Sequence, residues 1–137
     1  MQAEIFLPLP PRPATRPRFT CRGRFAVAYT DKPYREWLDK AADMLADTVM
    51  PAEWDKSSAF ELHAQFQVLK PKTSKLSYPQ PDTDNYVKGL MDAMTQAGHI
   101  WDDDKQVVSL SATKTFVDRE DMVGINITLT SLSPEEI

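Results

Sequence analysis

The sequence of 137 residues has one cysteine, two histidines and no long apolar run. Cys21 has no second cysteine to pair with and no Cys or His neighbours at ligand spacing, which excludes an internal disulfide and a structural zinc site. No apolar stretch approaches the roughly 20 residues that span a bilayer, and the start lacks the regions of a secretory signal. We therefore expect a soluble, cytoplasmic protein with no membrane partner.

The composition is that of an ordinary globular protein. Hydrophobic residues make up 42% and charged residues 26% of the chain, close to the averages for soluble domains. The length matches one domain that can bury most of its apolar surface, and no internal repeat is visible. We expect residues 1–137 to form a single domain with one core.

The chain also lacks the positive net charge that favours binding to nucleic acids. Its net charge of −4 argues mildly against a DNA partner, because affinity for DNA depends on neutralising phosphates. The charge is segregated, however: between Arg12 and Arg35 there are seven basic residues and one acid, Asp31. A second basic group comprises Lys70, Lys72 and Lys75. A basic run alone more often forms a solvated loop than a DNA-binding surface. The neighbouring motifs are therefore needed to choose between these two interpretations.

Hydrophobic periodicity predicts four strands and two helices. Apolar residues at every second position indicate strands at 4–9, 60–68, 107–116 and 122–129. Spacing of three or four indicates helices at 31 to about 50, capped by Thr30 or Asp31, and at 85–97, ended by Gly98. Pro13, Pro17 and Gly23 predict that residues 12–30 form a mobile loop or a ragged hairpin.

The order of these elements determines the expected fold class. A strand, a basic loop, a helix, a strand, a helix and two strands predict an α/β or α+β fold with a mixed sheet of about four strands. Two helices cover only one face of such a sheet. The other face, or an exposed edge, is then available for pairing with a second chain.

Acidic residues gather at both ends of the second predicted helix. In extended chain, residues two apart project to the same side, so Asp82 and Asp84 can face one hard cation. Lys88 lies one turn beyond Asp84 and can reach the same place. If the chain turns back after Gly98, one of residues 102–104, all aspartates, completes a site with three carboxylates.

Capping of the helix is the alternative role for these acids. Aspartate at a helix start accepts hydrogen bonds from backbone amides and interacts favourably with the helix dipole. Two acids, a lysine one turn later and three further acids exceed what capping requires, and clustered like charges destabilise a fold without a cation. We therefore predict a metal site, with caps and a solvated loop as the alternative.

A longer ordered pattern surrounds these acids. It consists of Asp82-Thr83-Asp84-Asn85, Lys88, Asp92-Ala93, Ala97-Gly98 and Trp101-Asp102-Asp103-Asp104-Lys105-Gln106-Val107-Val108. The pattern resembles the signature of the RusA family of Holliday-junction resolvases over residues 81–114, and the Leu7-Pro8-Leu9-Pro10-Pro11 segment before a basic loop resembles the family's start. The resemblance implies an α+β endonuclease that uses Mg²⁺, with Mn²⁺ as a substitute, and resolves four-way or other branched DNA as a homodimer.

The resemblance also implies roles for individual residues. Asp82 and Asp84 correspond to the first two catalytic and metal-binding acids, Lys88 to the essential lysine, and Asp104 to the third acid. Asp103 matches a neighbouring acid of the family and is a further expected metal ligand. Asp102, and one extra residue around His99, depart from the pattern, so the choice of third ligand among the three acids stays open. The expected DNA-binding residues are Arg12, Arg16, Arg18, Arg22, Arg24, Lys72 and Lys75.

Three rival interpretations remain. The chain can be a catalytically inactive module that binds branched DNA, or a structural domain whose acids only cap helices. Within the nuclease class, flaps or other branched DNA are alternative substrates, because one fold supports several functions. Nicking of a four-way junction in Mg²⁺ distinguishes the nuclease from the other two.

Overall fold

The computed structural model describes residues 1–15, 18–23, 25–29 and 31–137. Within these residues the strands are β1 (Gln2–Leu7), β2 (Arg18–Arg22), β3 (Phe25–Tyr29), β4 (Ala59–Leu69), β5 (Val107–Val117) and β6 (Gly124–Leu132). The helices are α1 (Lys32–Ala46) and α2 (Thr83–Ala97), and short 3₁₀ turns occupy Asp104–Gln106, Glu120–Met122 and Pro134–Glu136. The prediction of a small α+β fold is confirmed.

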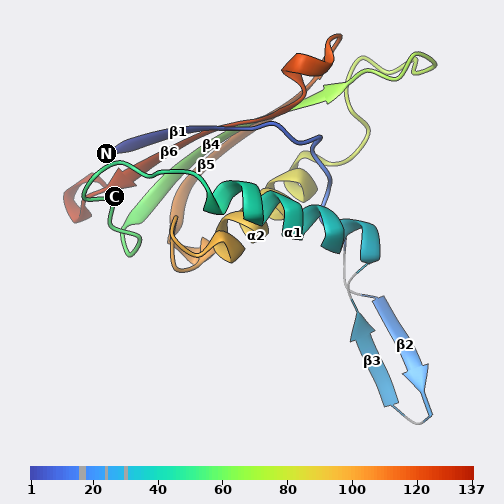
Figure 1. Ribbon diagram of the computed structural model, residues 1–137, viewed down its shortest axis with the longest axis horizontal. Helices are drawn as coiled ribbons and strands as arrows, with labels where there is room; N and C mark the ends of the chain where they lie inside the picture. The colour runs from blue at the N-terminus through green and yellow to red at the C-terminus, as the bar shows by residue number, and fades with distance from the viewer. Residues whose placement is uncertain (16–17, 24, 30) are drawn as a thin grey trace.

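A mixed sheet of four strands is the centre of the fold. Its strand order is β1-β6-β4-β5, and β4 and β5 are parallel while the other pairs are antiparallel. Parallel neighbours need a long crossover, which α2 provides. Both helices lie on one side of the sheet (Figure 1). No helix in the described ranges is long and apolar enough to cross a membrane.

Alternating side chains on β4 build the core beneath the helices. Phe60, Leu62, Ala64 and Phe66 are fully buried, whereas the intervening residues, such as Gln65, face the open side. Burying each large side chain stabilises the fold by about 1.5–3 kcal/mol. The central strand predicted from the period-two pattern is therefore confirmed.

The boundaries of several elements differ from the prediction, and α2 begins at Thr83 rather than at residue 85. The first helix ends at Ala46, not near residue 50, because Asp47 caps it, and Val49 is 92% exposed. The first strand covers 2–7 rather than 4–9, since Pro8 and Pro10 have no backbone donor. The last strand begins at 124 rather than 122, because the 3₁₀ turn Glu120–Met122 precedes it.

The basic segment contains a β-hairpin, one of the two forms predicted for it. β2 and β3 pair antiparallel with Arg18 opposite Tyr29, and Gly23 in the turn has a φ of +64°, which favours glycine. The hairpin stands away from the sheet and helices, beyond the start of α1 (Figure 1). Of the predicted DNA-binding residues, Arg16 and Arg24 lie outside the described residues.

The chain that enters the hairpin lies directly against α2. The Ala14 backbone amide donates to the Asn85 carbonyl at 2.9 Å. One turn later on α2, a Cβ atom at Gly89 would lie 2.9 Å from the Arg12 carbonyl oxygen. Only glycine fits this approach without displacing backbone, so Arg12 is held beside the helix that follows the acidic motif.

Candidate active site

The first acidic group lies at the start of α2. Asp82 is the N-cap residue in extended conformation, and its side chain makes no capping hydrogen bond. Its carbonyl instead accepts from the amides of Asn85 and Tyr86 at 3.1 and 3.2 Å. Asp84 lies in the first turn, where the helix dipole favours a negative charge. The exposed Asp82 carboxylate is thus not used as a helix cap, contrary to the capping alternative.

Lys114 on β5 holds the loop that leads into this helix. Its ammonium donates to the Pro81 carbonyl at 2.9 Å and lies 5.4 Å from the centre of the Tyr78 ring, within the range of a cation–π contact. The residue just before Asp82 is therefore fixed to the sheet. Lys72 and Lys75 are exposed on the same loop between β4 and α2.

After α2 the chain turns back toward the sheet. Gly98 has a φ of +91° and ends the helix in the left-handed conformation. Trp101 is buried, and its indole Nε1 donates to Thr95 Oγ1 at 2.7 Å. The Trp54 indole donates to the Ile100 carbonyl at 2.9 Å. These contacts bring the second acidic group back along the helix.

The Gln106 side chain fixes the turn that contains the three consecutive aspartates. Its Oε1 accepts from the amides of Asp102 and Asp103, both at 2.8 Å. Its Nε2 donates to the carbonyls of Lys56 and Ser58 at 2.8 and 2.7 Å. One side chain therefore satisfies four backbone groups and joins the acidic turn to the chain before β4.

The three aspartates of the turn point in different directions. Asp104 Oδ2 lies 3.6 Å from the Lys88 ammonium on α2. Asp102 Oδ1 lies 3.6 Å from the Lys56 ammonium, on the chain before β4. Asp103 is the N-cap of the 3₁₀ turn. The structure thus brings Asp104 to Lys88, while Asp102 pairs with a different lysine.

Lys88 lies between two carboxylates. Its ammonium is 2.9 Å from Asp92 Oδ1, one turn further along α2, in addition to the contact with Asp104. The hydrogen bond to Asp92 raises the pKa of Lys88, partial burial opposes that shift, and the charge of Asp104 adds to it. The side chain remains 56% exposed. Lys88 is therefore a positively charged group that solvent and a ligand can reach.

The acids at the two ends of α2 have the donor chemistry of a magnesium site. Carboxylate oxygens are the ligands that Mg²⁺ prefers, and this ion often uses only one or two of them and keeps several waters. Among the residues that the structure describes, no three His, Cys, Asp or Glu side chains are close enough to hold one metal ion. The donors fit the ion without forming a closed cage. The assignment of Asp82, Asp84, Asp103 and Asp104 as ligands stays a prediction.

A shallow recess lies beside Asp84 and Lys88. Its apolar floor comes from α2 and from the exposed edge strand β5, and its lining includes Thr83, Asp84, Val87, Lys88, Leu110 and Ala112. One acid, Asp84, and one cation, Lys88, border this hollow. The recess thus extends the candidate site from α2 onto β5.

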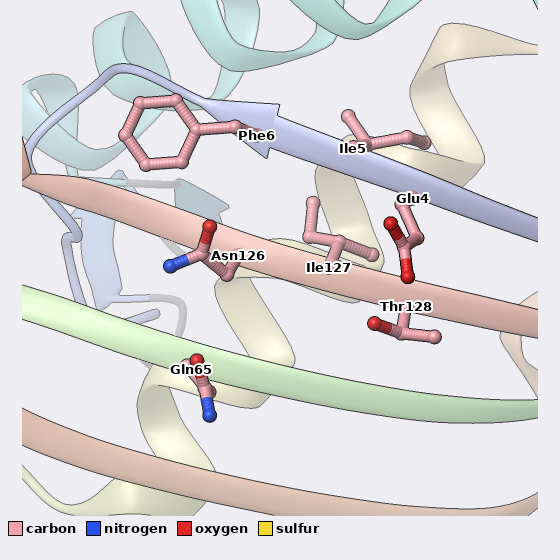
Figure 2. Close-up of a pocket in the computed structure, with 7 residues that line it drawn as sticks. All are labelled: Glu4, Ile5, Phe6, Gln65, Asn126, Ile127 and Thr128. Carbon is pink, nitrogen blue, oxygen red and sulfur yellow. The ribbon is translucent and has the colours of Figure 1, made fainter.

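A second hollow, on the open face of the sheet, lacks such chemistry. Figure 2 shows its side chains on three adjacent strands, with Glu4 and Phe6 on β1, Asn126 and Thr128 on β6 and Gln65 on β4. Glu4 is its one ionisable group. It lies on the face opposite the helices, so we do not assign it to the acidic site.

Sequence reasoning assigned no role to several residues that position the site. Asp92 and Gln106 belonged to the recognised pattern, but only the structure shows their contacts with Lys88 and the acidic turn. The spacing of four residues from Lys88 to Asp92 is a signal that could have indicated an ion pair. Lys114 had no such signal, because it contacts Pro81 across 33 residues.

Replacing Gln106 with alanine tests its role in holding the acidic turn. Gln106→Ala removes hydrogen bonds to four backbone groups, so we expect the free energy of unfolding to fall by about 1–3 kcal/mol. If the chain cuts branched DNA, as the resemblance predicts, cleavage should fall further than this loss explains, because the turn that carries Asp104 is no longer fixed. Urea unfolding and cleavage of a four-way junction measure the two effects. Gln65→Ala on the open face is the control, and an equal loss of cleavage there contradicts the assignment.

The chain has no significant match among curated proteins. The model of the family described as Endodeoxyribonuclease RusA matches residues 8–129, which contain both basic groups and every acid of the motif. Membership of this family implies endonuclease activity on Holliday junctions in general. Because the match covers most of the 137 residues, the chain belongs to the RusA endodeoxyribonuclease family.

Proposed function

We propose that the chain resolves four-way DNA junctions by hydrolysing phosphodiester bonds beside the start of α2. The observation that carries this proposal is the 3.6 Å contact between Lys88 and Asp104. It brings an acid from beyond the end of α2 to the lysine that lies one turn after Asp84. Membership of the RusA family supports the same chemistry and the same class of substrate.

We further propose that the acids of the motif hold Mg²⁺, for which Mn²⁺ can substitute. Asp82, Asp84 and Asp104 would be the ligands of one or two ions, with Asp103 as a further donor beside Asp104. Each ion would use one or two of these carboxylates and keep several waters, because the structure describes all four acids and no three of them lie close enough to hold one ion. A bound divalent ion supplies positive charge to the phosphate and lowers the pKa of a water that attacks it. The exposed Asp82 carboxylate, which the helix does not use as a cap, supports this role.

Lys88 would position the scissile phosphate and offset the negative charge that develops on it. A fixed cation aimed at developing charge stabilises a transition state more than a mobile one, because it needs little reorganisation. Contacts with Asp92 and Asp104 hold the ammonium in place. Lys88 thereby also reduces repulsion between the acids and the incoming phosphate.

The basic hairpin and the basic loop would supply affinity for DNA. Arg12, Lys72 and Lys75 are exposed, and Arg12 lies against α2 near Gly89. Arg18 and Arg22 belong to β2, and Arg16 and Arg24 complete the proposed set outside the described residues. A chain with a net charge of −4 needs such local positive charge to attract a polyanion.

The replacement of Asp82 by asparagine tests the assignment of the acids. Asp82→Asn removes a proposed ligand and a negative charge, so we expect cleavage of a four-way junction to fall by at least about 100-fold. Binding of the junction should stay the same or become tighter. A labelled junction and a matched linear duplex, with and without Mg²⁺, give cleavage on denaturing gels and binding on native gels.

The control for this experiment is Asp43→Asn, which removes an exposed acid from α1. Full cleavage by Asp82→Asn contradicts the proposed site. If the wild-type chain binds the junction without nicking it in Mg²⁺, the protein is a module that binds branched DNA. A flapped duplex in the same assay tests the rival substrate.

Removing the Arg12 side chain tests the proposed DNA contacts. If Arg12 neutralises one phosphate, Arg12→Ala weakens binding at every salt concentration and makes the slope of log K against log[salt] shallower by about one unit. Fluorescence anisotropy of a labelled junction over a salt series measures both quantities. Lys40→Ala, at an exposed position on α1 outside both basic groups, should leave the slope unchanged. An unchanged slope for Arg12→Ala removes this residue from the interface.

We also propose that the working enzyme is a homodimer, because paired nicks across a junction need two active sites. In the described sheet, β1 and β5 each pair with one neighbour only, and such edges can pair with a second chain. Sedimentation equilibrium at micromolar concentration should give twice the chain mass of 15.6 kDa. A species of 15.6 kDa under these conditions contradicts the proposal.

A further inference from the structure

The nearer ion-pair partner of Lys88 is Asp92, which is not one of the proposed metal ligands. Asp92 Oδ1 lies 2.9 Å from the Lys88 ammonium, and Asp104 Oδ2 lies 3.6 Å from it. Asp92 is one turn further along the same helix, and its side chain is 28% exposed. An exposed ion pair between neighbouring turns rarely fixes two side chains, so Lys88 would need further support to keep one position.

Tyr34 provides that support from the other helix. Its hydroxyl donates to Asp92 Oδ2 at 2.7 Å, while Asp92 Oδ1 faces Lys88. Tyr34 is 3% exposed, and its ring stacks against Trp37 with centres 6.3 Å apart. One oxygen of Asp92 is therefore fixed by a buried phenol, and the other is directed toward the ammonium.

The character of the phenol makes this support persistent. Burial, and then the hydrogen bond to Asp92, raise the pKa of Tyr34 well above its usual value. The hydroxyl thus stays protonated, and able to donate to Asp92, at higher pH than an exposed tyrosine does. A buried hydroxyl without an acceptor destabilises the folded protein. The packing of α1 on α2 therefore favours the orientation of Asp92 in which it accepts this hydrogen bond.

We propose that Tyr34 and Asp92 are positioning residues that hold the Lys88 ammonium beside Asp104 for the scissile phosphate. This inference rests on the proposed function, in which Lys88 contacts that phosphate. In this arrangement, neither Tyr34 nor Asp92 contacts DNA or metal. Tyr34 orients Asp92, and Asp92 orients Lys88. The rate of cleavage depends on the position of the Lys88 ammonium, because small errors in the placement of a charged group greatly slow a reaction.

Two variants separate the links of this chain of contacts. Tyr34→Phe keeps the buried ring but removes the donor to Asp92. Asp92→Asn keeps an oxygen acceptor for Tyr34 but removes the charge that attracts Lys88. We expect each variant to slow single-turnover cleavage of a junction on the order of tenfold, while affinity for the junction changes less than about twofold.

The matched control removes a different hydrogen bond between the same two helices. Gln96 on α2 donates to Asp39 on α1 at 2.9 Å, and neither residue contacts Lys88. Gln96→Ala should therefore leave the rate of cleavage unchanged. If Gln96→Ala slows cleavage as much as Tyr34→Phe does, the Tyr34 contact only joins two helices and the proposal is wrong.

A second measurement observes Lys88 without depending on nuclease activity. Heteronuclear NMR of lysine side chains reports the ¹³Cε and ¹⁵Nζ shifts and the order of each ammonium, and Lys88→Arg assigns the signal. In the wild-type chain without DNA, we expect the Lys88 ammonium to be more ordered than the ammonium groups of exposed lysines such as Lys40. Tyr34→Phe and Asp92→Asn should move the chemical shifts and the order of Lys88 toward the values of those exposed lysines. Gln96→Ala should leave both unchanged.

The two measurements distinguish failure of this inference from failure of the proposed function. If the wild-type chain cuts no branched DNA, the nuclease proposal fails, but the NMR signal still shows whether Tyr34 and Asp92 hold Lys88. If the Lys88 signal and the cleavage rate both match wild type in the two variants, Tyr34 and Asp92 do not position Lys88. A changed signal with an unchanged rate also overturns the proposal.

Discussion

The candidate site depends on the way the chain turns back after α2. Gly98 reverses its direction, the Trp101 indole bonds to Thr95, and Gln106 satisfies four backbone groups around the acidic turn. The turn that carries Asp104 is thus held by neutral hydrogen bonds rather than by its charges. Asp104 lies 3.6 Å from Lys88, and its side chain stays 30% exposed, so that a ligand can reach it.

Much of the fold follows from local patterns, but its pairing does not. The alternation at 60–68 and the apolar face at 85–97 correctly predict β4 and α2, because burial of one face dominates their energetics. The strand order β1-β6-β4-β5 joins opposite ends of the chain and has no local signal. The predicted end of α1 is too late in the chain because Val49 continues the apolar spacing of the helix. In the structure, Val49 lies beyond the capping residue Asp47, in exposed chain.

The candidate site divides in a similar way. The spacing of Asp82, Asp84 and Lys88 along one chain predicts that they lie near one another, because extended chain and helix have fixed geometry. Spacing cannot predict which aspartate of the acidic turn reaches Lys88, since only the folded turn shows that Asp104 faces Lys88 while Asp102 faces Lys56. Tyr34 is harder still: its position at helical spacing predicts a core residue, and its bond to Asp92 spans 58 residues.

The same contacts connect the basic hairpin to the acidic site. The chain entering the hairpin bonds to α2 through Ala14 and Asn85, and the chain leaving it bonds to α2 through Tyr34 and Asp92. Both attachments lie within three turns of one helix, on either side of Lys88. The segments before and after the hairpin are therefore both attached to the helix that carries Lys88, through residues that precede and follow Lys88 on that helix.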